Sequence, residues 1–119
     1  MRYVDGFVLP VPKKKMPAYL RLARKAGKVW RDHGALEYRE ATGDDLETKC
    51  GVAFPRLLKL KRGEIAVFSW IVYKSRAHRD AVNKKAMKDP RLLAMMDPKA
   101  MPFDMKRMTH GGFKIPVDL

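Results

Sequence analysis

Asp5 is the acidic residue whose position most favours chemistry. Residues 2–11 alternate as a strand does, which places Asp5 on the same face as Tyr3 and Phe7. A carboxylate beside aromatic side chains is partly desolvated, so it needs a charge partner or hydrogen-bond donors, or its pKa rises. Asp5 could therefore act as a general acid or base or anchor a polar ligand. The alternative is an internal salt bridge, for which Arg107 on the last expected strand is the candidate.

Other candidate pocket residues lie on two further expected strands. His110 directly precedes two glycines and could shuttle a proton, because the imidazole pKa is near neutrality. Ser69 and Trp70 lie on opposite faces of strand 64–73, and a purely structural core role is the simpler interpretation of Trp70. In the functional interpretation Trp70 forms a wall, and Arg107 is the counter-charge of Asp5. The predicted catalytic residues are Asp5 and His110, and the predicted pocket residues are Tyr3, Ser69, Trp70 and Arg107.

Several classes of site are absent from the sequence. The 3 histidines have no metal-ligand spacing, and the single cysteine, Cys50, excludes an internal disulfide and a cysteine-based zinc site. There is no glycine-rich phosphate loop, nucleophile elbow or dinucleotide fingerprint. We therefore expect no cofactor and no metal. The C-terminal third is rich in methionine, which is typical of adaptable core or interface filler: Met87, Met95, Met96, Met101, Met105 and Met108.

The chain is strongly basic, with 26 Lys and Arg against 13 Asp and Glu and a formal net charge of +13. This excess points to an acidic partner such as nucleic acid. An RNA-recognition signature fails, because Glu64 and Ala66 occupy the positions where aromatic side chains would stack on bases. What remains is non-specific phosphate binding or a solvated surface. The candidate polyanion face lies on the first expected helix: Arg21, Arg24, Lys25, Lys28 and Arg31.

The chain's location can be inferred from what it lacks. No apolar run approaches the roughly 18–20 residues needed to span a bilayer, and the N-terminus does not have the pattern of a signal peptide. A lone cysteine favours a reducing compartment. We therefore expect a cytoplasmic protein with no membrane partner.

The 119 residues suit one domain spanning residues 1–119. Pro17 fits the first turn of a helix and Gly34 the position just after its end. Ser75 is a plausible N-cap of a second helix, and Pro90 limits how far that helix runs. The expected elements are strand 2–11, helix 17–33, strand 35–42, a loop over 44–62 with a short strand at 54–60, strand 64–73, helix 75–89, a helical turn at 91–96 and strand 106–115.

The order β-α-β-β-α-β is that of a ferredoxin-like α+β fold, with two helices on one face of a four-stranded antiparallel sheet. Strand 64–73 is apolar on both faces, so the face away from the helices also needs cover. A second copy packing sheet to sheet would supply it. We therefore expect a homodimer that encloses a partly apolar space.

Several short sequence motifs resemble those of the YbaA-like family, a group of small bacterial proteins of unknown function. The resemblance covers nearly the whole chain, and it implies the dimeric α+β barrel fold without any established activity. It rests on Tyr3-Val4-Asp5-Gly6-Phe7-Val8, Val67-Phe68-Ser69-Trp70-Ile71, Arg79-Asp80 with Asn83 and Asp89-Pro90, Met101-Pro102-Phe103-Asp104, Lys106-Arg107-Met108 and Gly111-Gly112-Phe113.

Two functional hypotheses follow from the sequence. The first is a homodimeric barrel that binds a small, partly apolar ligand between sheet and helices; by analogy with the superfamily it could be a cofactor-independent oxygenase or isomerase. The second is a module that binds RNA or another polyanion through the basic helix face.

Overall fold

The computed structural model describes residues 1–119, and its centre is an antiparallel sheet of four strands in the order β2-β3-β1-β4. The central pair is formed by β1 (Tyr3–Pro12) and β3 (Glu64–Tyr73), with β2 (Glu37–Thr42) and β4 (Thr109–Lys114) at the edges. A helical segment connects β1 to β2 and another connects β3 to β4, so the predicted β-α-β-β-α-β order is confirmed.

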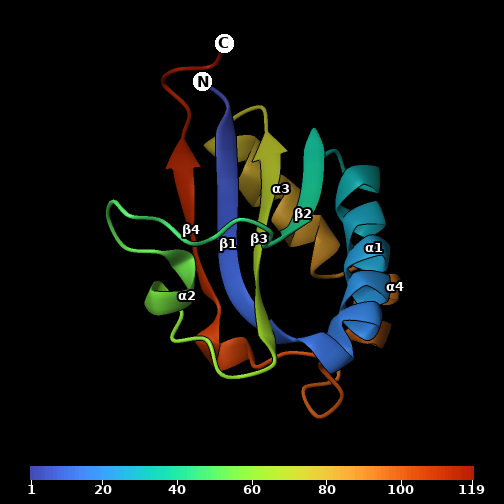
Figure 1. Cartoon of the computed structure of the whole chain (residues 1–119). Helices are drawn as coiled ribbons and strands as arrows, with labels where there is room; N and C mark the ends of the chain where they lie inside the picture. Colours follow the sequence, from blue (N-terminus) through green and yellow to red (C-terminus); the bar gives the residue numbers. More distant parts are fainter.

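One face of the sheet is covered by α1 (Met16–Asp32), α3 (Arg76–Ala86) and α4 (Pro90–Met95). In Figure 1 α3 lies behind the strands, and α1 lies to their right with α4 behind it. A 3-10 turn, η1 (Lys13–Lys15), leads into α1. Pro17 occupies the first turn of α1, as predicted, because its missing N–H would have no partner there. Gly34 follows the helix with φ +111°, a conformation that side chains rarely adopt. The bounds predicted for this helix are within one residue of those observed.

The alternation of side chains along β1 and β3 matches the sequence pattern. Tyr3 pairs with Tyr73, Asp5 with Ile71, Phe7 with Ser69 and Leu9 with Val67. These residues all face the helices, because side chains that pair directly across two strands point to the same face. Val8, Phe68 and Trp70 face the other way.

The segment between β2 and β3 departs from expectation. Instead of a strand over 54–60 it forms a short helix, α2 (Phe54–Leu57), with Pro55 in its first turn, and Lys59 then adopts φ 51°. The prediction of a strand is wrong, because both features break an extended conformation. In Figure 1 this segment crosses in front of the sheet, on the face opposite the helices, and the Phe54 ring lies 6.3 Å from that of Phe68. The face expected to be bare is therefore partly covered by the chain itself.

The C-terminal half follows the predicted order with shifted boundaries. Ser75 caps α3 by accepting a hydrogen bond from the His78 amide at 3.1 Å, as predicted. The helix ends at Ala86 rather than Asp89, because the Asp89 carboxylate caps α4 by accepting from the Arg91 amide. A 3-10 turn, η2 (Met105–Arg107), precedes β4, so the last strand begins later than predicted.

The buried apolar side chains form three clusters between the sheet and the helices. The cluster around Leu9, Val67 and Tyr19 joins the inner strands to the first half of α1. A second joins Ile71 and Tyr73 to α3, through Val82. No helix combines the length and apolar character needed to cross a membrane.

Candidate functional site

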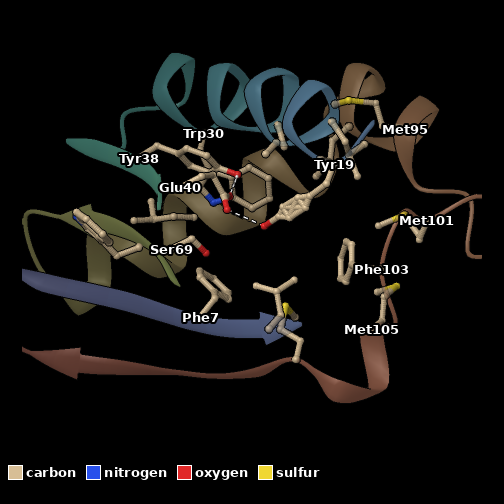
Figure 2. A pocket seen from close by; sticks show the side chains of 18 of the residues that line it. Phe7, Tyr19, Trp30, Tyr38, Glu40, Ser69, Met95, Met101, Phe103 and Met105 are labelled. Atoms are coloured by element: carbon tan, nitrogen blue, oxygen red, sulfur yellow. Dashed lines mark hydrogen bonds between the residues drawn. The ribbon is translucent and has the colours of Figure 1, made fainter. Parts of the chain in front are cut away.

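A cavity of about 230 Å³ lies between the sheet and the helices (Figure 2). Its floor is the helix-facing side of β1, β2 and β3, its roof is α1, and α4 and the segment before β4 form one end. Of the 20 lining residues 17 are hydrophobic, so the polar groups are few: Arg39, Glu40 and Ser69. Such a lining, mostly apolar with a few polar groups, is typical of a small-molecule site.

Glu40 is the carboxyl group of this cavity, and two tyrosine hydroxyls hold it. Tyr19 Oη donates to Glu40 Oε1 at 2.6 Å, and Tyr38 Oη donates to Oε2 at 3.0 Å (Figure 2). The three residues come from α1 and β2, so the polar centre joins the roof to the floor. The Tyr19 bond has the short length of a hydrogen bond to an ionised acceptor.

Burial raises the pKa of the Glu40 carboxyl, and hydrogen bonds from Tyr19, Tyr38 and Ser69 oppose that rise. Burial, with the adjacent Glu40 as a second cause, also raises the pKa of both tyrosine hydroxyls, so they stay protonated and remain donors. No arginine or lysine contributes to the pKa shift of Glu40. The cavity therefore contains an acid without a counter-charge.

Two features of α1 determine the shape of the roof. A Cβ on Gly27 would lie 2.6 Å from Cδ1 of Tyr38, so only glycine allows the helix to approach this ring so closely. Trp30 donates from Nε1 to Asn83 Oδ1 at 3.0 Å, which fixes its indole between α1 and α3. Both contacts place an aromatic ring where it bounds the cavity.

Methionines and Phe103 close the end of the cavity, and the Phe103 ring centroid lies 5.5 Å from that of Tyr19. This agrees with their interpretation as adaptable filler. Of the six methionines in the C-terminal third only Met87 is outside the lining, and it is exposed. The lining methionines are Met95, Met96, Met101, Met105 and Met108.

The start of α4 is tied to the end of α1 by charged groups. His33 Nε2 and Arg91 Nη2 lie 2.8 and 2.9 Å from Asp89 Oδ2, and Arg91 also reaches Asp32 at 2.8 Å. Hydrogen bonds from Arg91 and then His33 lower the pKa of the Asp89 carboxyl well below its usual range. These contacts hold α4, and with it the end of the cavity, against α1.

A groove lies outside the cavity, between α1 and β2. It is bounded by Arg24, Gly27 and Arg31, and it shares Tyr38 and Glu40 with the cavity. Arg31 donates to the Leu36 carbonyl rather than to Glu40. The carboxyl therefore lies between an apolar interior and a basic outer surface.

The structure brings two of the predicted pocket residues to the cavity. Ser69 lines it from β3, facing the helices. Trp70 also borders it, although the indole belongs to the opposite sheet face, where Nε1 donates to Glu37 Oε1 at 2.9 Å. Tyr3, Asp5, Arg107 and His110 are not among the lining residues.

Asp5 faces the helices beside α3 rather than the cavity. Arg79 Nη1 lies 3.8 Å from Asp5 Oδ1, and Arg79 also donates to the Tyr3 hydroxyl at 3.1 Å, with its guanidinium 5.0 Å from the centre of that ring. Burial raises the pKa of the Asp5 carboxyl, with Arg79 opposing the rise. The expected pairing of Asp5 with Arg107 is therefore wrong, because α3 supplies the cation.

Arg107 instead anchors the segment that crosses the open sheet face. It contacts the Glu64 carboxylate through Nη1 at 2.6 Å and Nη2 at 3.0 Å, and Nη2 donates to the Lys59 carbonyl at 3.1 Å. This pair lowers the pKa of Glu64 and raises that of Arg107. Arg107 is thus a structural clamp at the start of β3.

His110 is exposed on β4, with its ring stacked 5.8 Å from the Phe7 ring, which does line the cavity. A catalytic role for Asp5 and His110 stays a prediction. No group of three or more His, Cys, Asp or Glu side chains is arranged to hold a metal ion.

The predicted polyanion face points into solvent. Its five basic residues are all exposed, and none forms an ion pair. They are Arg21, Arg24, Lys25, Lys28 and Arg31.

Comparison with solved structures defines the fold class. A NIPSNAP family protein from Agrobacterium tumefaciens superposes with a TM-score of 0.59 at 18% identity, covering 99% of this chain and 95% of the other. A dimeric ferredoxin-like protein from an uncultured marine organism gives a TM-score of 0.58 at 13% identity, with complete coverage of both chains at 100%. A NIPSNAP domain protein from Burkholderia xenovorans gives 0.57 at 15% identity, covering 94% and 92%. The ferredoxin-like α+β fold is thereby confirmed.

The sequence itself places the chain in a family. Residues 2–105 match the model of the protein family of unknown function DUF1428. The uncharacterised protein YbaA of Escherichia coli K12 is 42% identical over 118 residues, which cover 99% of each chain. The chain belongs to this YbaA-like family, as its motifs predicted.

Proposed function

We propose that the protein binds a small, partly apolar ligand in the cavity between the sheet and helices α1 and α4. The observation that carries this proposal is a cavity of about 230 Å³ whose apolar lining contains one carboxyl group, Glu40. An engineered apolar cavity of about 150 Å³ already accepts benzene. The cavity therefore has room for an aromatic ring with a short side chain.

Binding of a neutral aromatic probe such as indole, followed by amide chemical shifts, tests this proposal. Ala26 lines the cavity from α1, so Ala26→Phe should fill it and abolish binding. Ala81 is exposed on α3 and gives the matched control, Ala81→Phe, which should bind as the wild type does. Equal binding to both variants, or shifts that map outside the cavity, would contradict the proposal.

The oxygenase or isomerase chemistry suggested by the fold needs a group that accepts or delivers a proton. Within the cavity Glu40 is that group, and burial raises the pKa of its carboxyl toward the range useful for proton transfer. Asp5 and His110 lie outside the lining. An enzymatic function therefore rests on Glu40 in this proposal.

We further propose a homodimer formed through the sheet face opposite the helices. On that face the side chains of Phe68 and Phe113 are 45% and 61% exposed. A solved neighbour is described as a dimeric ferredoxin-like protein. Sedimentation velocity at micromolar concentration should show a dimer that Phe113→Asp dissociates, whereas Leu93→Asp, at an exposed apolar position on α4, leaves it intact. A monomeric wild type would refute this proposal.

The second candidate function is non-specific polyanion binding. It is favoured by the five exposed, unpaired basic residues of α1. Affinity for a single-stranded RNA should fall steeply with salt, and neutralising Arg21, Lys25 and Lys28 to glutamine should flatten that dependence. Neutralising Lys59, Lys61 and Arg62 is the control of equal charge. An equal effect of both triple variants would show that net charge, not the helix face, determines binding.

A further inference from the structure

The polar end of the cavity offers mostly hydrogen-bond acceptors. The hydroxyl hydrogens of Tyr19 and Tyr38 are both directed to the Glu40 carboxylate, at 2.6 and 3.0 Å. The Ser69 hydroxyl lines the same part of the cavity. Because both tyrosine hydrogens are committed to Glu40, a ligand meets the lone pairs of one carboxylate and two tyrosine oxygens. The group that fits there must bring donors of its own.

No cation of the protein fills this position. Arg39 borders the cavity, but its guanidinium extends to Glu37 at 3.9 Å and to the Tyr38 carbonyl at 3.1 Å. Arg24 and Arg31 lie on the outer groove, are exposed to solvent, and form no ion pair with Glu40. A half-buried carboxylate without a counter-charge is costly, so a positively charged ligand gains free energy here that a neutral one does not.

The remaining wall suits the apolar body of such a ligand. The lining includes the rings of Phe7, Tyr19, Trp30, Tyr38 and Phe103. Aromatic rings attract an ammonium group and pack against another aromatic ring. The methionine thioethers at the far end are polarisable and adapt to the shape of the ligand.

We propose that the cavity binds a small hydrophobic primary amine, whose ammonium group is held by the Glu40 carboxylate and the hydroxyl oxygens around it. This inference rests on the proposed binding function and names its ligand class. A primary ammonium carries three donors and no acceptor, which matches the acceptor-rich end of the cavity. A carboxylic acid of the same size would place two negative charges together, and an alcohol would supply one donor without charge.

Three probes that share a ring and chain length separate these chemistries: 2-phenylethylamine, 2-phenylethanol and phenylacetate. Calorimetric titration at pH 7.5 in 0.15 M salt, which screens the outer arginines, should give binding of the amine at least about tenfold tighter than that of the alcohol, and no binding of the acid. Glu40→Gln should weaken binding of the amine much more than binding of the alcohol, and so remove the preference for the amine. Glu37→Gln is the matched control, because Glu37 is on the same strand but faces the other side of the sheet.

Carboxyl carbon NMR of the wild type provides a measurement that needs no variant. Binding of the amine should lower the apparent pKa of Glu40, whereas the alcohol should leave it where it is. Equal affinity of amine and alcohol, or preferential binding of the acid, would overturn the amine assignment while ligand binding in the cavity stands. Failure of all three probes and of indole would overturn the proposed function as well.

Discussion

Removing the hydroxyl of Tyr19 is expected to destabilise the fold through Glu40. Tyr19→Phe deletes the donor that lies 2.6 Å from Glu40 Oε1 and leaves the ring that packs against Phe103. A hydrogen bond to a charged group contributes about 1.5–3 kcal/mol net, so we expect a loss of about 2 kcal/mol in the free energy of unfolding. With a urea m-value of about 2 kcal/mol/M, the unfolding midpoint falls by about 1 M with an unchanged slope.

The same substitution in a Glu40→Gln background isolates the contribution of the charge. There the Tyr19 hydroxyl donates to a neutral amide, so Tyr19→Phe should cost only about 1 kcal/mol, which leaves a coupling of about 1 kcal/mol between the two positions. An equal cost in both backgrounds would refute the view that an ionised Glu40 is the partner of Tyr19.

The raised pKa of Glu40 predicts how the stability difference between Glu40→Gln and the wild type changes with pH. The pKa of Glu40 is raised in the folded protein, so the folded state holds its proton more tightly than the unfolded chain does. The contribution of Glu40 to stability is therefore greatest at low pH, and it falls as pH rises from about 4.5, the ordinary glutamate value, through the folded-state pKa. Glu40→Gln removes this dependence, so its stability relative to the wild type should improve across that window. A relative stability that is constant with pH would contradict the raised pKa.

Three further substitutions test the surroundings of the site. Gly27→Ala should cost about 1–3 kcal/mol by urea unfolding despite the better helix propensity of alanine, because the new Cβ would lie 2.6 Å from the Tyr38 ring; a stabilised variant would refute this contact. Arg107→Gln should lower the unfolding midpoint at neutral pH, and the difference from the wild type should shrink as pH falls from 4.5 through the lowered pKa of Glu64. A loss that is independent of pH would exclude the ion pair as the cause. Asp5→Asn should cost about 1–3 kcal/mol at neutral pH, because it leaves the partly buried Arg79 guanidinium with only the exposed Asp80 as a charged partner. Unchanged stability would show that this pair contributes nothing net.

The elements that local sequence determines were predictable. The bounds of β3 match the prediction because its run of apolar residues on both faces ends sharply at Glu64 and Tyr73. The N-cap of α3 was equally clear at Ser75. The prediction of a strand over 54–60 was wrong because the apolar residues there suggested alternation, whereas Pro55 lies in the first turn of a short helix.

The site was harder to predict, because it depends on which elements meet in space. The edge strand β2 has polar residues on both faces, so its pattern alone does not show which of Glu37 and Glu40 faces the helices. The spacing of Tyr38 and Glu40 contained the signal, since residues two apart share a face of a strand. To predict that this face is the one toward the helices, one must know where α1 packs. The contact between Gly27 of α1 and the Tyr38 ring shows this only in the structure.

Two carboxyl groups on the helix-facing side of the sheet, those of Asp5 and Glu40, have contrasting surroundings. Asp5 and Glu40 both have pKa values raised by burial, but Asp5 has a guanidinium 3.8 Å away, whereas Glu40 has only hydroxyl groups. Arg79 thus supplies the counter-charge of Asp5, whereas no cationic side chain forms an ion pair with Glu40. The net charge of +13 does not change this, because Arg24 and Arg31 are exposed to solvent on α1 and the Arg39 guanidinium lies near Glu37. A cationic ligand would give Glu40 the counter-charge that Arg79 of α3 already gives Asp5. Glu40 is therefore the carboxyl group at which ligand recognition should be tested.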